Sequence, residues 1–472
     1  MNWQELLLEK RERYARSTPR PGDLRSEFEK DYHRIIGSAS FRRLQDKTQV
    51  FPLDKSDFIR TRLTHSLEVS SFARSLGQSV GAEIIDKKLD PAFGERQKEN
   101  ISDILQCAGL IHDIGNPPFG HFGELCIRCW FKENLPKLKF RDQPVTDLLT
   151  EWMCQDFYHF EGNAQALRLL SRLHFLVDEH GMNLTYGLLS SIIKYPVSSM
   201  ETDTESDDIT RHKIGYFYAD RELFDDLMSS TGLYGHRNPL AFLLEAADDI
   251  AYKTADLEDA FKKGFISFYD LLMEIESIEK ESGGEEAPPG SAYLKRLYQK
   301  GKETGTDEPE LYAAQNWIVA LQSYLLNSAS NSFIERYDEL MEGSCKTDLF
   351  HGTKAERIMD LLGDMGFRYV FDTEFIYKLE LATGEIYDYL LNRLVHACIY
   401  YDTEYWEQSR TPSDHKLMSI ISDNYKRAYA SQSAGKPEGE KLYLRLLLVT
   451  DYISGMTDSY AKNLYQDIRG IR

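Results

Sequence analysis

The stretch that decides the fold spans residues 101–124 and reads ISDILQCAGLIHDIGNPPFGHFGE. Its first half carries apolar residues at the spacing of one helical stripe, namely Ile101, Ile104, Leu105, Ala108 and Ile111. His112 and Asp113 follow this stripe, and the Gly-Asn-Pro-Pro sequence after them forces a turn, because proline cannot continue a helix. The sequence therefore predicts a buried helix that ends in an adjacent imidazole and carboxylate.

An adjacent imidazole and carboxylate at a buried helix end are costly to desolvate unless they have a partner. A divalent cation would be such a partner, since imidazole nitrogen and carboxylate oxygen both bind divalent ions. A second histidine stands upstream, in residues 59–77, which read IRTRLTHSLEVSSFARSLG. An apolar helix face begins just after this residue, His65, so we expect it at the entrance of a helix. Taken alone, it would more often be a capping or surface residue than a ligand.

Residues 243–259 read LLEAADDIAYKTADLED and place Asp248, Tyr252 and Asp256 at positions i, i+4 and i+8. Such positions drift by only about 80° around a helix, so an acid, a phenol and an acid share one face. The flanking residues are apolar, and we therefore expect this polar stripe to face a cavity inside the molecule. A histidine, a His-Asp pair and a separate aspartate, each on an apolar helix, together supply the ligands of one metal site.

The composition is typical of a globular helical protein. The chain has 472 residues, of which 42% are hydrophobic and 28% charged, and its 30 glycines and 15 prolines exclude a collagen-like or wholly disordered chain. Regular strand alternation is scarce, so we predict an all-α fold. Six cysteines are too few for a disulfide scaffold. The single CxxC, Cys126 and Cys129, has no second pair to complete a zinc site, and we interpret it as ordinary helical thiols.

The net charge of −20 repels nucleic acid and anionic membranes over long range, so an anionic ligand must be held by a local cluster of cations. The first residues lack the cationic-then-apolar order of a secretory signal, and the most apolar stretches are short and interrupted by charge. We therefore expect a soluble cytoplasmic protein with no membrane segment.

Three segments rich in Gly, Pro, Ser or charge are predicted to be solvated loops, at residues 200–210, 279–291 and 431–441. The middle one is the best candidate for a boundary. We predict an N-terminal helical segment (1–57), a helical core (58–278) that holds the candidate metal ligands, and a C-terminal helical region (279–472).

The order His65, His112-Asp113, Asp248 resembles the H…HD…D signature of the HD-domain metal-dependent phosphohydrolases. The match extends to the bacterial dGTP triphosphohydrolase (dGTPase) family, through the strings FRRLQDKTQVFPL, RTRLTHSLEV, LIHDIGNPPFGHFGE, FEGNAQ, EAADDIAY and DYISGMTD. These strings are spread over residues 41–458, nearly the whole chain. Asn116 stands where some other deoxynucleotide triphosphohydrolases have a further histidine, and NPPFGH is similar to the dGTPase branch.

The resemblance implies that residues 58–278 form an HD-domain phosphohydrolase core, that residues 1–57 contribute sugar and base contacts, and that the additional helical C-terminal region, 279–472, completes the pocket and the oligomer contacts. It also implies hydrolysis of dGTP, or other dNTPs, at the α-phosphorus to deoxynucleoside and inorganic triphosphate. It implies that His65, His112, Asp113 and Asp248 bind one divalent ion, Mn²⁺ or Mg²⁺, because this donor set suits several ions. His121 and Glu124 are similar to the family's catalytic histidine and its acidic partner, in which the carboxylate favours the protonated imidazole.

The remaining motif matches imply substrate contacts. For the phosphates they are Arg62, Asn163, Lys194, Tyr195, Lys213 and His159, and for the sugar and base Gln49, Val50, Tyr252 and Asp256. An aromatic ring where a ribose 2′-hydroxyl would project excludes ribose, and loss of that hydroxyl's water contacts costs about 1–3 kcal/mol, or about tenfold to a hundredfold in selectivity. Nothing in these residues specifies guanine on physical grounds.

Two other readings remain open from the sequence. An HD phosphodiesterase or nucleotidase would act on a monophosphate or a cyclic nucleotide, and would not need the predicted cluster of phosphate-binding cations. A non-catalytic nucleotide-binding or single-stranded-DNA-binding HD protein would keep the fold, although the net charge disfavours a groove that tracks a nucleic-acid backbone. The resemblance further implies a homo-oligomer, often a hexamer, and a response to a second nucleotide or to single-stranded DNA in some members.

Overall fold

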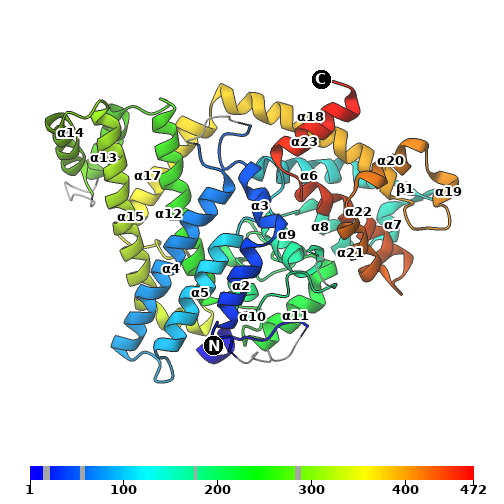
Figure 1. Ribbon diagram of the computed structural model, residues 1–472, viewed down its shortest axis with the longest axis horizontal. Helices are drawn as coiled ribbons and strands as arrows, with labels where there is room; N and C mark the ends of the chain where they lie inside the picture. Colours follow the sequence, from blue (N-terminus) through cyan, green and yellow to red (C-terminus); the bar gives the residue numbers. More distant parts are fainter. Residues whose placement is uncertain (14–21, 54–58, 175–177, 282–288, 472) are drawn as a thin grey trace.

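The computed structural model describes residues 1–13, 22–53, 59–174, 178–281 and 289–471, and these residues form a mostly helical molecule (Figure 1). In this part of the chain the only sheet is a small antiparallel pair, β1 (Lys139–Phe140) with β2 (Gln143–Pro144). The prediction of an all-α fold is confirmed. All six cysteines are free thiols, with Cys126 and Cys129 on one helix, as predicted.

Four long helices form the frame that carries the site: α4 (Arg62–Lys87), α5 (Glu95–Ile111), α12 (Pro239–Lys262) and α15 (Pro309–Glu335). Helix α4 packs along α5 and α12, and α15 covers α4 and α12. The backbones of α4 and α5 approach so closely that a Cβ on Gly109 would lie 2.5 Å from the Ser70 Cα. Small residues at this crossing therefore set how near the two helices lie.

Local capping explains where two of these helices begin. The Thr61 hydroxyl accepts a hydrogen bond from the Thr64 backbone N–H, and the Thr64 hydroxyl oxygen accepts one from the Thr61 N–H, which starts α4 at Arg62. The predicted helix entrance at His65 thus falls one turn inside the helix. For α12, the Asn238 side chain accepts a hydrogen bond from the Leu240 N–H, with Pro239 in the first turn as the sequence predicts.

Further helices precede α4 or lie between α5 and α12 in the chain. Those before the frame are α1 (Trp3–Leu6), α2 (Glu27–Ile36), α3 (Ala39–Arg43) and η1 (Leu44–Asp46). Those between α5 and α12 are α6 (Gly120–Asn134), η2 (Leu135–Lys137), α7 (Val145–Leu148), α8 (Glu151–Tyr158), α9 (Gly162–Arg168), η3 (Leu169–Leu173), α10 (Tyr186–Ser191), η4 (Ile209–Arg211), η5 (Tyr218–Asp220) and α11 (Arg221–Ser230).

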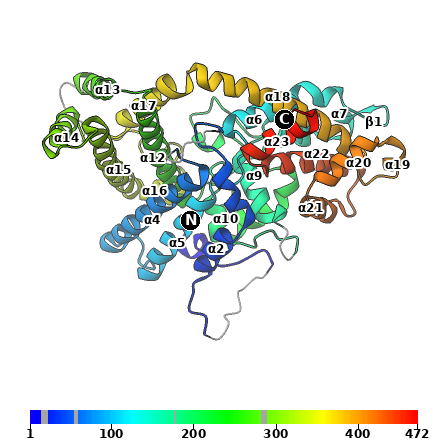
Figure 2. The ribbon, with the colours of Figure 1, turned by 45° about the horizontal axis from the view of Figure 1, so that its top comes forward.

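The C-terminal region reaches both ends of the elongated molecule (Figures 1 and 2). Its elements are α13 (Phe268–Glu281), α14 (Ser291–Thr304), α16 (Tyr337–Glu342), α17 (Glu356–Gly366), η6 (Phe367–Phe371), α18 (Glu374–Cys398), α19 (Trp406–Ser409), α20 (Pro412–Ile420), α21 (Asp423–Ser433), α22 (Glu438–Ser454) and α23 (Asp458–Arg469). Helix α18 runs along one edge and contacts α6, α20, α22 and α23. The C-terminal helices therefore pack directly on the helix that follows the NPPFG turn.

The predicted boundary after residue 278 falls near the end of α13, and most of the predicted linker, residues 282–288, lies outside the described residues. Helix α15, beyond that boundary, packs on α4 and α12. The three-part division of the chain stays a prediction. The predicted loop at 431–441 is shorter than expected, because α21 continues to Ser433 and α22 begins at Glu438.

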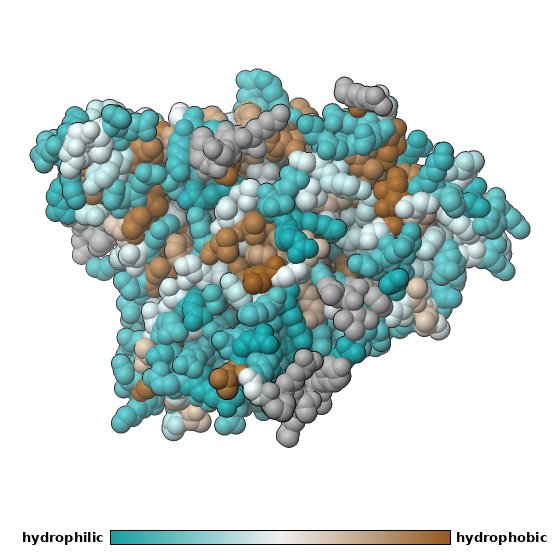
Figure 3. Space-filling view, in the orientation of Figure 1, coloured by the Kyte–Doolittle hydropathy of each residue, from teal (hydrophilic) through white to brown (hydrophobic). Residues whose placement is uncertain are grey.

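Hydrophilic residues cover most of the face seen in Figure 3, and hydrophobic residues form separate patches on it. Among the helices that the structure describes, none has both the length and the apolar character needed to cross a bilayer.

Candidate active site

Three helices bring the four predicted metal ligands together. His65 lies in the first turns of α4, His112 and Asp113 follow the last residue of α5, and Asp248 lies in the middle of α12. The Asp248 Oδ1 is 3.1 Å from the His65 Nε2 and 3.3 Å from the His112 Nε2. The His112 Nε2 is 3.7 Å from the Asp113 Oδ2. Residues up to 183 positions apart thus converge on one point.

The donor atoms of this cluster fit a divalent cation. The His112 Nδ1 lies 2.8 Å from the Gly109 carbonyl oxygen, to which it donates, so its Nε2 carries the lone pair that faces the cluster. Among the described residues, His65 Nδ1 and His112 Nε2 are buried polar atoms without a hydrogen-bond partner. Ligand atoms of His65, His112 and Asp113 lie within 4.8 Å of one another. Two imidazoles and two carboxylates at one buried point suit a divalent ion and do not select which one.

The charges around the cluster keep its carboxylates ionised. Burial raises the pKa of Asp113, but the Arg62 guanidinium and His112 outweigh burial and hold it well below its usual range. Asp248 is likewise buried, and the Lys194 ammonium and His112 lower its pKa. The Lys194 Nζ lies 2.8 Å from the Asp248 Oδ2. Anionic oxygens are therefore available at this point throughout the physiological pH range.

A histidine-carboxylate pair stands on the first turn of α6. The His121 Nδ1 lies 3.0 Å from the Glu124 Oε2, and the Glu124 Oε1 accepts a 2.8 Å hydrogen bond from the Gly162 N–H. The His121 side chain is 75% exposed, whereas that of Glu124 is 1% exposed. The hydrogen bond to Glu124 and its charge raise the pKa of His121. A buried, anchored carboxylate thus orients an accessible imidazole and favours its protonated form.

Both groups face one cavity with an empty volume of about 950 Å³. Its lining residues come from widely separated parts of the chain. They are Gln49, Arg62, Asp113, Asn116, His121, Asn163, Lys194, Tyr195, Lys213, Glu245, Asp248, Asp249, Tyr252 and Phe371.

Three cations of the cavity wall are held by carboxylates. Arg62 forms an ion pair with Asp113, and Lys194 with Asp248, so both cations touch the metal-site carboxylates directly. The Lys213 Nζ lies 3.1 Å from the Glu161 Oε1. The cavity wall therefore supplies three cations, each paired with a carboxylate, although the protein as a whole is acidic.

Of the predicted sugar-side residues, Gln49 and Tyr252 line the cavity. Burial, with Asp256 one helical turn further along α12, raises the pKa of Tyr252, and the Tyr252 ring stacks on Phe371 with centroids 6.5 Å apart and an interplanar angle of 22°. Burial, with Asp259 next, raises the pKa of Asp256. Gln49 lines the same cavity, and its Oε1 is buried without a partner among the described residues.

Three predicted contact residues do not line the cavity. Val50 is buried in the core beside Gln49, with 6% of its surface exposed. Asp256 is buried behind Tyr252. The His159 Nδ1 lies 3.1 Å from the Gln155 carbonyl oxygen, and burial lowers the pKa of its imidazole. To act on a substrate in the cavity, each of these three side chains would have to move or to act through another residue.

The structure adds residues that the sequence interpretation misses. Glu161 stands within the FEGNAQ string, is 1% exposed, and accepts hydrogen bonds from Asn163 and Lys213. Its other oxygen, Oε2, has no hydrogen-bond partner and lies 3.6 Å from the Arg128 guanidinium. Asp249 also lines the cavity, and burial followed by Glu245 raises its pKa to about 7. Membership of the motif strings signalled Glu161 and Asp249; nothing local signals Phe371.

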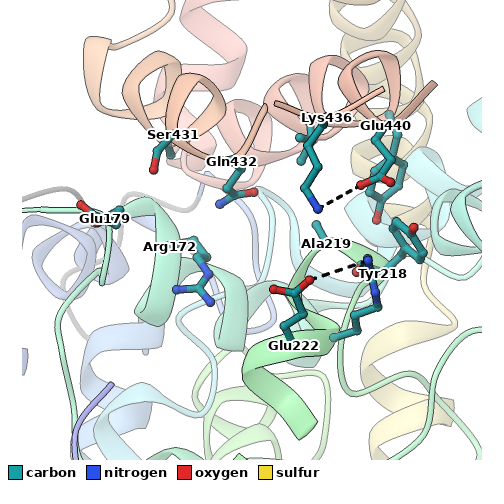
Figure 4. A pocket seen from close by; sticks show the side chains of 13 residues that line it. Arg172, Glu179, Tyr218, Ala219, Glu222, Ser431, Gln432, Lys436 and Glu440 are labelled. Atoms are coloured by element: carbon teal, nitrogen blue, oxygen red, sulfur yellow. Dashed lines mark hydrogen bonds and ion pairs between the residues drawn. The ribbon is translucent and has the colours of Figure 1, made fainter. Parts of the chain in front are cut away.

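A second cavity, with an empty volume of about 810 Å³, lies between η3, η5 and α11 on one side and α21 and α22 on the other (Figure 4). Several of its charged groups form ion pairs. The Lys436 Nζ lies 3.3 Å from the Glu440 carboxylate, and the Arg221 guanidinium 3.9 Å from Glu222 (Figure 4). Arg172 lies 2.7 Å from Glu12. We assign no chemistry to this cavity.

The helical frame and the His-Asp cluster define the class of the protein. The family model named HD domain matches residues 62–145, which contain His65, His112, Asp113 and His121, and Asp248 joins them from outside the matched segment. The protein is an HD-domain phosphohydrolase with additional helices.

The particular family follows from comparison over the full length. Deoxyguanosinetriphosphate triphosphohydrolase-like proteins of Listeria innocua and Listeria monocytogenes are each 46% identical to the chain over 473 residues, covering 100% of both sequences. The deoxyguanosinetriphosphate triphosphohydrolase of Cronobacter sakazakii is 32% identical over 484 residues, covering 94% of both. The chain belongs to the deoxyguanosinetriphosphate triphosphohydrolase-like family. The resemblance stated from the motifs is confirmed.

Proposed function

We propose that this protein hydrolyses dGTP at the α-phosphorus and releases deoxynucleoside and inorganic triphosphate. Assays with the other dNTPs define how far the activity extends to them. The observation that carries the proposal is one cavity that combines the His-Asp cluster, three cations and the His121-Glu124 pair. Family membership supports a nucleotide substrate.

His65, His112, Asp113 and Asp248 are the residues that would hold the divalent ion, for which we propose Mn²⁺ or Mg²⁺. When bound, such an ion neutralises phosphate charge and lowers the pKa of a coordinated water molecule. Arg62 and Lys194 lie beside these ligands and would bind the phosphate nearest to the cluster. Lys213, with Asn163 and Tyr195, would hold the more distant phosphates.

His121 is proposed to move the proton of the reaction. Its imidazole is accessible in the cavity, and Glu124 raises its pKa, so it can give a proton to the oxygen of the leaving group. Glu124 keeps the orientation of the ring because the Gly162 N–H anchors its other oxygen. At the sugar end, the Tyr252 ring is proposed to exclude a ribose 2′-hydroxyl, with Gln49 and Asp256 near the 3′-hydroxyl.

The alternative of a phosphodiesterase or nucleotidase is distinguished by the products. A triphosphate needs the three cations that line the cavity, and a monophosphate does not. We expect the purified chain with Mn²⁺ to convert dGTP to deoxyguanosine and inorganic triphosphate. Release of orthophosphate, or of deoxyguanosine monophosphate, would count against the proposal. Assays of the four dNTPs, singly and in pairs, define base preference and any activation by a second nucleotide.

A non-catalytic nucleotide-binding or single-stranded-DNA-binding role is distinguished by His121→Ala. This change leaves the four metal ligands in place, so we expect metal content to stay at the parent level while turnover falls by about 10²–10⁴-fold. Turnover equal to that of the parent would remove His121 from the mechanism. We further propose a cytoplasmic homo-oligomer, whose mass light scattering would measure; a hexamer is the assembly that the resemblance implies.

A further inference from the structure

Three buried side chains, all from outside the matched HD-domain residues 62–145, hold the turn that joins Asp113 to His121. The Lys47 Nζ donates a 2.5 Å hydrogen bond to the Asn116 carbonyl oxygen, and the Tyr387 hydroxyl donates a 2.8 Å bond to the Pro118 carbonyl oxygen. The Asp458 Oδ1 accepts a 2.8 Å hydrogen bond from the Phe119 N–H. Lys47, Tyr387 and Asp458 are 3%, 2% and 1% exposed. Three polar groups that are expensive to bury thus converge on one five-residue turn.

The turn has a backbone conformation that it would not adopt unaided. Phe119 has φ of 61°, in the left-handed region that bulky residues avoid, and Gly120 follows with φ of 60°. A Cβ on Gly120 would lie 2.5 Å from the Arg62 Nη2. These two residues begin α6, so their conformation sets where His121 stands relative to Arg62.

The second oxygen of Asp458 reaches the substrate side of the cavity. Its Oδ2 accepts hydrogen bonds from the Thr48 N–H at 2.9 Å and from the Thr48 hydroxyl at 2.5 Å. The next residue, Gln49, lines the cavity. The preceding residue, Lys47, accepts a 2.9 Å bond at its carbonyl oxygen from the Arg62 N–H. One carboxylate, more than 300 residues further along the chain, therefore joins the turn that carries His121 to the segment that carries Gln49.

We propose that Asp458 is a positioning residue that sets the distance between His121 and the Gln49-Arg62 side of the cavity, with Lys47 and Tyr387 holding the same turn. Asp458 acts through Phe119 and Thr48, and it does not touch the substrate. This inference rests on the proposed function. It explains why a string at the C-terminus of the chain, DYISGMTD, accompanies a site whose ligands end at Asp248.

The test compares Asp458→Asn with Ser459→Ala. Asparagine keeps the shape but turns a donor toward Thr48 or Phe119, so one of the two ties is broken. Ser459 is the matched control, because its hydroxyl donates a 2.8 Å bond to Asp46 and so joins the same two chain segments without touching the turn. Thr48→Val, which removes only one hydroxyl from Asp458, is a milder second variant should Asp458→Asn fold poorly.

For Asp458→Asn we expect faster hydrogen exchange in peptides covering residues 116–124, and a kcat for dGTP lower by about 10²-fold at parental metal content, since a small misplacement has this effect. Thr48→Val should show a smaller loss in the same direction, and Ser459→Ala neither change. Parental kcat in Asp458→Asn, or equal losses in Ser459→Ala, would overturn the inference. If the parent hydrolyses no dNTP, the proposed function fails, and the exchange rates alone decide whether Asp458 holds the turn.

Discussion

Two cavities in the described part of the chain are similar in size and differ in chemistry. In the cavity between η3, η5, α11, α21 and α22, cations such as Lys436 and Arg172 pair with carboxylates, and none of its described lining residues has a buried polar atom without a partner. Of the described residues that line the candidate active-site cavity, Gln49 and Arg62 each have a buried polar atom without a hydrogen-bond partner.

The difference teaches how a reactive site is recognised physically. A buried polar atom without a partner destabilises the folded state by about 1–3 kcal/mol, so such atoms in the lining of a cavity indicate groups kept ready for a ligand. Charges that neutralise each other have no such requirement. The size of a cavity alone therefore does not identify a reactive site. Buried hydrogen-bond donors and acceptors without partners in the lining distinguish the two cavities.

The largest expected effect comes from a metal ligand. Asp248→Asn removes the carboxylate that faces both histidines and Lys194, and we expect at least about a 10³-fold loss of dGTP hydrolysis together with loss of bound Mn²⁺. Metal content by elemental analysis and a product assay measure the two effects. Asp103→Asn, which removes a carboxylate on α5 that pairs with Arg74, is the control. Parental metal content in Asp248→Asn would contradict the assignment.

A smaller effect concerns the sugar. Tyr252→Ala removes the ring that stacks on Phe371, and we expect the preference for dGTP over GTP, as a ratio of kcat/KM values, to fall by about tenfold to a hundredfold. Tyr252→Phe keeps the ring and loses only the hydroxyl, so its preference should stay close to that of the parent. An unchanged ratio in Tyr252→Ala would show that another residue excludes ribose.

The third prediction concerns pH. Glu124 raises the pKa of His121, so the imidazole keeps its proton to a higher pH than a free histidine would. If protonated His121 drives turnover, kcat/KM falls as pH rises through that raised pKa, and Glu124→Gln should move this alkaline limb to lower pH. A pH profile of both proteins measures the shift. An alkaline limb at the same pH in both would mean that His121 does not produce it.

The smallest effect is expected at the second cavity. Lys436→Ala removes one partner of a partly exposed ion pair, which typically contributes about 0–1 kcal/mol, so dGTP hydrolysis should stay within about twofold of the parent. Lys194→Ala, the matching change in the catalytic cavity, should instead strongly reduce kcat/KM, because Lys194 touches Asp248. A large loss in Lys436→Ala would break the distinction between the two cavities.

Much of the fold and of the site could be predicted from residue chemistry at short range. The helical period places Asp248, Tyr252 and Asp256 on one face of α12, and the Pro239 start of that helix follows from the sequence. The prediction of where α4 starts is less accurate, because the Thr61 capping box starts the helix before the apolar stripe begins.

Other contacts could not be predicted because they have no local signal. Glu161 lies in a recognised string, yet its contacts with Lys213 and Arg128 depend on how the segment after η4 and helix α6 approach α9. Phe371 reaches Tyr252 from a π-helical segment of the C-terminal region. The three predicted contacts that stay outside the cavity show the converse, since a motif match does not say which way a side chain points.

By itself the sequence determined the helical class, the family and the identities of the candidate metal ligands, because these depend on periodicity and on which side chains are present. Only the tertiary structure decided that Arg62 and Lys194 touch the ligand carboxylates and that Asp458 holds the turn beside His121. The physical reason is that buried polar groups must find partners wherever packing brings them, and packing joins residues hundreds of positions apart.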